Sequence, residues 1–168
     1  MRISQDLYRL AIGRLLAAGG VDPVQADSMT ENLVWCDMAG RRNHGIERLP
    51  IMLKRVQSGA IKCPCEPQIS RLAAAVGRID ADAGFGHHAG KLGMDLACEL
   101  AAEAGVGAVG ICNSNFFGAG AYFVQLAAER GMIGLALSNS FPKVAAHGGI
   151  APVLGTNPLA FSAPRVDG

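Results

Sequence analysis

The stretch RRNHGIERLP, residues 41–50, places a histidine and an arginine one helical turn apart. Gly45 follows His44 directly, which leaves room beside the imidazole for a ligand. An imidazole can donate or take a proton when a hydride moves on or off a carbon–oxygen bond. Arg48 could hold a substrate carboxylate through two parallel hydrogen bonds. From this stretch alone, a polar connection between two helices is the stronger interpretation, and a proton-and-carboxylate site is the alternative.

Three loops that follow expected strands carry the remaining candidate groups. NSNFFGAGAY, residues 113–122, joins a strand to a helix and contains small residues at which a backbone could closely approach a ligand. The start of that helix could hold a phosphate. SNSFPK (138–143) and LGTNP (154–158) add short polar side chains, including Thr156 and Asn157 before a proline-fixed turn. Ligand sites favour such positions, but ordinary turns occupy them as well.

The stretch GVGAVG, residues 105–110, matches the letters of the dinucleotide fingerprint G-x-G-x-x-G. That fingerprint needs a strand before it and a helix after it, so that phosphate meets free N–H groups. Here the glycines follow an expected helix, and Gly105 is better interpreted as the cap at its C-terminus. We therefore predict a strand at this position, and no Rossmann-type phosphate loop.

The first part of the chain is expected to form three short helices, over residues 4–18, 22–38 and 49–59, with RRNHGIER connecting the second to the third. A serine and an Asp-Pro pair at the first two starts are typical helix caps. The side chains expected to face the core are Leu7, Ala11, Ile12, Leu15, Leu16, Ala26, Met29, Leu33, Cys36, Leu49, Met52, Leu53 and Val56. We assign residues 1–62 to a helical N-terminal region.

The remaining residues, 63–168, are assigned to the first part of an α/β body. Short strands are expected over residues 69–72, 76–79, 106–112, 132–138 and 159–163, and helices over residues 88–104 and 118–130. Strands that alternate with helices are typical of a layered α/β fold.

The composition is that of a globular chain. Half of the 168 residues are hydrophobic and 17% are charged, which argues against disorder. A formal charge of +1 provides no basic field for nucleic acid or an anionic membrane. The sequence shows no signal peptide and no apolar run of ~18 residues, so a cytoplasmic location is expected by default.

The cysteines and two of the histidines are expected to be structural. Cys63 and Cys65 are separated by one residue, which is too short for a zinc ribbon or a redox motif. The five cysteines are interpreted as reduced and mostly buried, and no metal site is expected. His87 and His88 lie at an expected helix start and are predicted to face solvent.

Several separate motifs, in order, resemble one enzyme family. They are NHGIERLP, DAGFGHHAG, NSNFFGAGAY, GMIGLALSNSFP, HGG and LGTNPLAFSAP, and they run over essentially the whole chain. Together they resemble the N-terminal half of the malate/L-lactate dehydrogenase family of the non-Rossmann type. That family includes malate, sulfolactate and ureidoglycolate dehydrogenases, diketogulonate reductase and cyclic ketimine reductases.

The resemblance implies an N-terminal helical bundle packed on a mixed-sheet α/β/α body, incomplete relative to the family, and a homodimer. It implies an oxidoreductase that uses NAD or NADP to interconvert a small 2-hydroxy acid and its 2-oxo acid, or to reduce a cyclic imino acid. By resemblance, His44 is the proton donor and Arg48 the carboxylate partner. The residues implied to contact the cofactor or line its cleft are Phe117, Gly118, Ala119, Gly120, Ser140, Thr156 and Asn157.

Two local departures from the family pattern bear on activity. Asn43 stands where the family generally has serine, and an amide cannot relay a proton as a hydroxyl does. Phe116 stands where the family commonly has histidine, which removes a titratable group. The alternative reading is therefore a truncated, catalytically silent paralogue that acts as a ligand-binding or interaction module.

Overall fold

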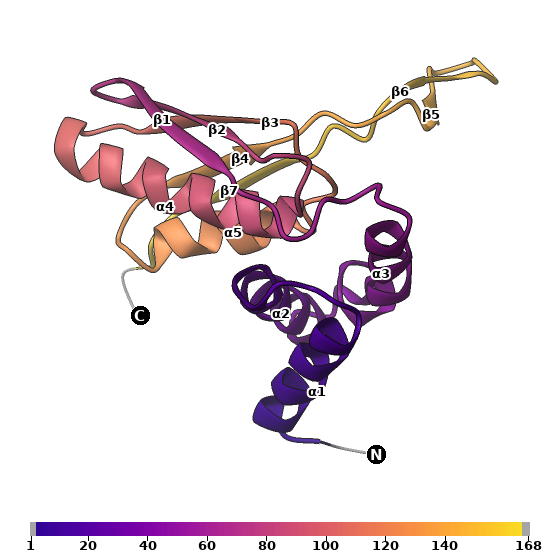
Figure 1. Ribbon diagram of the computed structural model, residues 1–168. Helices are drawn as coiled ribbons and strands as arrows, with labels where there is room; N and C mark the ends of the chain where they lie inside the picture. Colours follow the sequence, from indigo (N-terminus) through magenta and orange to yellow (C-terminus); the bar gives the residue numbers. More distant parts are fainter. Residues whose placement is uncertain (1–2, 166–168) are drawn as a thin grey trace.

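The computed structural model describes residues 3–165, which form a group of helices joined to a layer of strands and helices (Figure 1). The helices are α1 (Gln5–Ala18), α2 (Pro23–Met38), α3 (Leu49–Gln57), α4 (Gly86–Ala104) and α5 (Gly120–Ala128), with short 3-10 turns η1 (Arg42–His44) and η2 (Ile46–Arg48). The strands are β1 (Gln68–Ala73), β2 (Val76–Asp80), β3 (Ala108–Cys112), β4 (Gly134–Leu137), β5 (Val144–Ala145), β6 (Pro152–Leu154) and β7 (Leu159–Ser162). The expected mixed α/β class is confirmed.

Capping residues explain where the first two helices begin. The Leu7 N–H donates to Ser4 Oγ at 3.3 Å, and the Val24 N–H donates to Asp22 Oδ1 at 3.0 Å. Pro23 occupies the first turn of α2, where its missing N–H removes no helical hydrogen bond. Both starts agree with the sequence prediction to within a residue.

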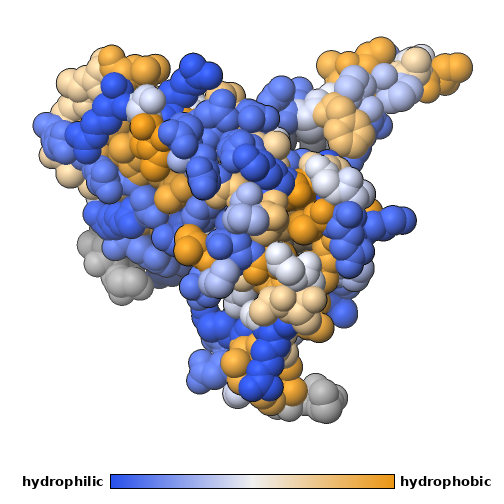
Figure 2. Space-filling view, viewed as in Figure 1, coloured by the Kyte–Doolittle hydropathy of each residue, from blue (hydrophilic) through white to orange (hydrophobic). Residues whose placement is uncertain are grey.

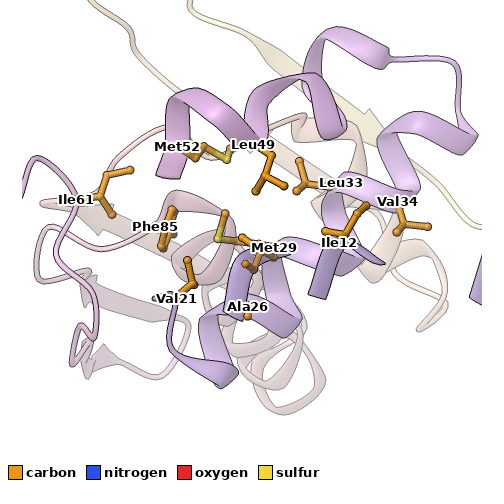
Figure 3. Packing of buried hydrophobic residues seen from close by; sticks show 11 residues of the cluster. Ile12, Val21, Ala26, Met29, Leu33, Val34, Leu49, Met52, Ile61 and Phe85 are labelled. Carbon is orange, nitrogen blue, oxygen red and sulfur yellow. The ribbon is translucent and has the colours of Figure 1, made fainter. Parts of the chain in front are cut away.

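The helical region packs around a core that also receives one residue from the body. Met29 and Leu33 of α2 are fully buried in this cluster, and Phe85, directly before α4, belongs to the same cluster (Figure 3). Burying a side chain of this size contributes about 1.5–3 kcal/mol. Phe85 therefore ties the start of α4 to the helices that carry the 41–50 connection.

The expected inward face of α1 is only partly correct. Ile12 and Leu16 are fully buried. Leu7 and Leu15 are 54% and 48% exposed, and Ala11 is exposed too. Because α1 packs chiefly on α2, one neighbouring helix covers only a narrow stripe of its surface.

The strands form three small sheets. β2 lies between β1, which is antiparallel to it, and β3, which is parallel to it. β4 and β7 form a separate antiparallel pair. β5 and β6 pair in a thin arm that projects from the body and carries hydrophobic residues at its end, where Ile150 is fully exposed (Figures 1 and 2). The sequence did not predict this arm, because strands of two and three residues are too short to show an alternating pattern.

The helices α4 and α5 pack against each other on one side of the strands (Figure 1). α4 contacts β2 and β3, whereas α5 contacts β4 and β7. Gly105 ends α4 in the left-handed conformation, with a φ of 81°. The order of helix, cap and strand confirms that GVGAVG is not a phosphate loop.

No helix within residues 3–165 is long and apolar enough to cross a membrane. In the same part of the chain all five cysteines are free thiols. Cys36 and Cys98 are buried, whereas Cys63, Cys65 and Cys112 are half-buried. Burial of the cysteines is therefore less complete than the sequence suggested.

Candidate active site

Asp37, near the end of α2, fixes the connection that carries the candidate catalytic residues. Its Oδ2 accepts hydrogen bonds from the Ile46 N–H at 2.8 Å and from the Tyr8 hydroxyl at 2.7 Å. Burial, and then the Asp37 carboxylate, raise the pKa of Tyr8, so its hydroxyl remains a donor. A Cβ at Gly45 would lie 2.1 Å from Asp37 Oδ1. Gly45 therefore allows close packing, and does not leave room for a ligand as the sequence suggested.

His44 lies at the end of η1 with its ring stacked on Phe116. The ring centroids are 5.8 Å apart and the planes differ by 7°. The His44 Nδ1 is buried and has no hydrogen-bond partner within residues 3–165. Burial, followed by the charges of Arg48 and Arg41, lowers the pKa of His44. The neutral imidazole is favoured, and an anionic ligand beside it would favour the cation.

Arg48 contacts the same aromatic ring. Its Cζ lies 5.4 Å from the Phe116 ring centroid, which is within the range of a cation–π interaction. Its Nε donates to the Asn43 carbonyl oxygen at 2.6 Å. Its two terminal nitrogens have no protein partner in the described part of the chain. They are available for two parallel hydrogen bonds to a carboxylate.

The prediction that His87 and His88 face solvent is wrong. His87 is fully buried, its ring meets the edge of Phe116 at 5.7 Å between centroids, and neither ring nitrogen has a partner in the described residues. His88 is 8% exposed, and its Nδ1 lies 3.0 Å from Ser28 Oγ. The prediction failed because of a tertiary contact. Helix α2 covers the first turn of α4, so neither histidine at this helix start is exposed to solvent.

Replacing His87 with glutamine should reduce the acid sensitivity of the fold. Burial, and then the charge of His44, lower the pKa of His87 to about 3, against about 6.5 in an unfolded chain. The unfolded state binds more protons in this interval, so stability falls as the pH drops from about 6.5 towards about 3. In urea unfolding, wild type should lose about 2 kcal/mol more than His87→Gln between about pH 7 and about pH 5.

The matched control is His147→Gln, because His147 lies in an exposed loop. This variant should lose as much stability in acid as wild type. Equal acid sensitivity of His87→Gln and wild type would show that His87 is protonated in the folded state without cost.

The stacked rings border a long groove of about 1650 Å³. The predicted site residues that line it are His44, Phe117, Gly118, Ser140 and Thr156. The others lie next to the groove without lining it: Arg48, Ala119, Gly120 and Asn157. Arg55 and Lys143 also line the groove, although the sequence did not single them out. The groove therefore brings together residues from the helical connection and from all three loops.

Gly118, in the 113–122 loop, packs closely against α2 and the start of α4. Its φ is 83°, and a Cβ there would lie 2.6 Å from Asn32 Oδ1 and 2.9 Å from His87 Nε2. Asn32 and His87 fill the side-chain position at Gly118, so only glycine fits there. Helix α5 then begins at Gly120 with Ala119 as its N-cap, and no side chain caps its first N–H groups. Gly118 and Ala119 are themselves buried, and of residues 117–120 it is Phe117 and Gly118 that line the groove.

The two later loops are tied to each other by short polar side chains. Ser140 Oγ lies 3.2 Å from Thr156 Oγ1 and accepts a hydrogen bond from the Thr156 N–H at 3.0 Å. Asn157 Oδ1 accepts from the Ser140 N–H at 3.0 Å. Ser140 and Thr156 thus line one side of the groove. Asn157 does not line it, and its side chain fixes the backbone of Ser140 through this hydrogen bond.

Asp37 and Asn32 were missed from the sequence. Both belong to α2 and have no motif around them, so only the tertiary contacts of Asp37 with Gly45 and of Asn32 with Gly118 identify them. Residues 3–165 contain no group of three or more His, Cys, Asp or Glu side chains that could hold a metal ion.

The sequence and the fold both match known proteins. A profile described as malate/L-lactate dehydrogenase matches residues 3–168. The malate dehydrogenase of Pyrococcus abyssi is 37% identical over 164 residues, which are 98% of this chain and 45% of that protein. The structure of malate dehydrogenase from Pyrococcus horikoshii superposes with a TM-score of 0.94 at 37% identity, over 100% of this chain and 48% of the other.

A second solved structure extends the range of relatives. The delta1-piperideine-2-carboxylate reductase from Pseudomonas syringae superposes with a TM-score of 0.93 at 33% identity, over 100% of this chain and 51% of that chain. The chain thus spans about half the length of the relatives it matches. A match over nearly every residue, together with the superposition of the whole described fold, shows that the chain belongs to the malate/L-lactate dehydrogenase family.

Proposed function

We propose that this chain provides the proton and carboxylate end of a dehydrogenase site that uses NAD or NADP. The substrate would be a small 2-hydroxy acid and its 2-oxo acid, or a cyclic imino acid. The names of the relatives support both classes, since two are malate dehydrogenases and one is a delta1-piperideine-2-carboxylate reductase. Both classes carry a carboxylate next to the carbon that would be reduced.

The observation that carries the proposal is the position of His44 and Arg48 on one aromatic ring. The His44 ring is stacked on Phe116, and the Arg48 guanidinium lies over that same ring. A carboxylate held by the free nitrogens of Arg48 would place the neighbouring C2 substituent on the His44 side. His44 would then protonate the oxygen or nitrogen on C2 during reduction, and remove that proton during oxidation.

The loops on the other side of the groove would hold the cofactor. Phe117 and Gly118 would contact it from the loop that ends in Ala119 and Gly120, and the Ser140–Thr156 pair, held by Asn157, would line the groove opposite. A bound nicotinamide supplies or accepts the hydride at its C4 atom. Phe116 and Phe117 would exclude water from that region, because both present apolar rings.

The asparagine that replaces the family serine does not disturb the orientation of Arg48. Arg48 is held by the backbone carbonyl oxygen of Asn43, and any side chain at this position leaves that carbonyl in place. The proposal therefore assigns no proton relay to Asn43. His44 would exchange its proton with solvent through the groove that it lines.

We also propose that the protein works as a homodimer, with residues 1–62 and 63–168 as its helical and cofactor-binding parts. Exposed leucines on α1, among them Leu7 and Leu15, support a further packing surface on the helical part. Light scattering of the purified protein should give twice the chain mass. A monomer at every concentration would contradict this part of the proposal.

The test of the function is oxidation of NADH and of NADPH by the native protein with a panel of 2-oxo acids and cyclic imino acids. Loss of the reduced nicotinamide absorbance should depend on both substrate and protein. A folded protein that turns over none of these acids would contradict the proposal.

Phe116 favours one second candidate, a silent module that binds nucleotide without turnover. Its ring covers one face of His44 where the family commonly has a histidine. Calorimetry separates the two candidates. Binding of NADH with no consumption of any acid in the panel would support the silent module.

A further inference from the structure

The start of α4 holds the loop that carries Phe116. Asn115 donates to the Gly84 carbonyl oxygen from its backbone N–H and from its Nδ2, each at 3.2 Å. A Cβ at Gly86 would lie 2.2 Å from the Asn115 carbonyl oxygen, so the helix start packs directly on the loop backbone. Phe85, between these two glycines, is buried in the core of the helical region. The backbone that leads into Phe116 therefore rests on an anchored segment.

His87, in the first turn of α4, brings a side chain to the Phe116 ring. The two ring centroids are 5.7 Å apart and the planes differ by 66°. His87 is fully buried, and neither of its ring nitrogens has a hydrogen-bond partner within residues 3–165. Burying an imidazole without a protein partner costs stability. Among these residues, the contribution of His87 therefore depends on the shape and packing of its ring and not on hydrogen bonds.

The Phe116 ring supports both candidate catalytic side chains. His44 is stacked on it at 5.8 Å between centroids, and the Arg48 Cζ lies 5.4 Å from its centroid. Phe116 is half-buried, so its orientation depends on the side chains that it packs against. A tilt of this one ring would change the surroundings of His44 and of Arg48 together.

We propose that His87 is a positioning residue for the candidate active site. Its ring holds Phe116 in one orientation, and Phe116 in turn orients His44 and Arg48. His87 takes no part in proton transfer, because it does not line the groove. The catalytic consequence rests on the proposed function, whereas the contact between the rings does not.

The test is an NMR titration of the His44 ring in the purified protein, which needs neither substrate nor cofactor. His87→Ala opens space beside Phe116, so the ring can tilt and solvent can reach His44. Burial is the main cause that lowers the pKa of His44, so this pKa should rise towards the ordinary histidine range. Burial, and then the charge of His44, lower the pKa of His87 to about 3, so the substitution removes no charge near neutral pH.

His88→Ala is the matched control. His88 is the next residue of α4 and is also buried, but its Nδ1 lies 3.0 Å from Ser28 Oγ on α2. This variant should leave the pKa of His44 unchanged, and His87→Gln, which refills most of the space, should restore the wild-type titration. If truncation to alanine unfolds the protein, His87→Asn and His88→Asn provide the same comparison. An unchanged pKa of His44 in the His87 variant, or an equal rise in the His88 variant, would overturn the proposal.

The kinetic constants provide a second readout. In His87→Ala, kcat for a 2-oxo acid should fall and KM should rise, because the displaced ring supports both groups. Together these changes should lower kcat/KM about 10²-fold. Wild-type values of both constants in His87→Ala would overturn the positioning role. A folded wild type without turnover would instead contradict the proposed function, and the titration of His44 would still decide the role of His87.

Discussion

The His44→Ala variant is expected to lose a factor of about 10²–10⁴ in kcat for reduction of a 2-oxo acid, the usual contribution of a placed general acid. His44 lines the groove and contacts the same Phe116 ring as Arg48. Without its imidazole the oxygen on C2 must take its proton from water. Because the proposal assigns carboxylate binding to Arg48, KM should change little. Steady-state rates of NADH or NADPH oxidation measure both constants.

The pH profile distinguishes a proton donor from a residue that only supports the fold. Burial and the neighbouring arginines lower the pKa of His44, so its cation is favoured only below the ordinary histidine range. In wild type, kcat/KM for reduction should therefore rise as the pH falls through this lowered pKa, and in His44→Ala this rise should be absent. His147→Ala, in an exposed loop, should keep the wild-type profile. Full turnover by His44→Ala would refute the assignment.

The Arg48→Ala variant should raise KM for the acid about 100-fold, because two charge-assisted hydrogen bonds to the carboxylate contribute about 3 kcal/mol together. The free terminal nitrogens of Arg48 make this assignment specific, since Nε is already bonded to Asn43. The kcat value should fall less than in His44→Ala, because the proton donor is still present. Initial rates over a range of acid concentrations separate the two constants.

Arg48→Lys and Arg14→Ala complete the comparison. Lysine keeps the charge but not the planar fork, so its KM should lie between those of wild type and Arg48→Ala. Arg14 lies on the exposed side of α1, and its loss should leave KM unchanged. If Arg48→Ala bound the acid as tightly as wild type, the carboxylate would have to lie on another cation, with Arg55 and Lys143 as the groove-lining candidates.

The helix ends could be predicted from the sequence because they depend on interactions between residues that are close along the chain. Ser4 and Asp22 satisfy free N–H groups at helix starts, and Gly105 takes a left-handed conformation at a helix end. These effects act over a few residues, so the sequence shows them directly. The same local reasoning separated GVGAVG from a phosphate loop.

Contacts between distant segments decided what the sequence could not show. His87 is buried because α2 covers the start of α4, and Gly45 is needed because Asp37 packs against it. From the sequence, Phe116 was notable only because the family commonly has histidine at this position. Its contacts with both His44 and Arg48 depend on how the 113–122 loop folds against the helical connection.

The most direct test of the site is an isotope-transfer measurement, in which deuterium is followed from the reduced cofactor to the acid product. The native protein is given a 2-oxo acid and reduced nicotinamide dinucleotide deuterated at C4 on the transferred face, and the hydroxy acid product is examined by mass spectrometry. The product should carry the deuterium at C2, and His44→Ala should form the same labelled product about 10²–10⁴ times more slowly. Product without deuterium at C2, or labelled product formed at the wild-type rate by His44→Ala, would refute the role of His44 as the proton donor in a hydride transfer to C2.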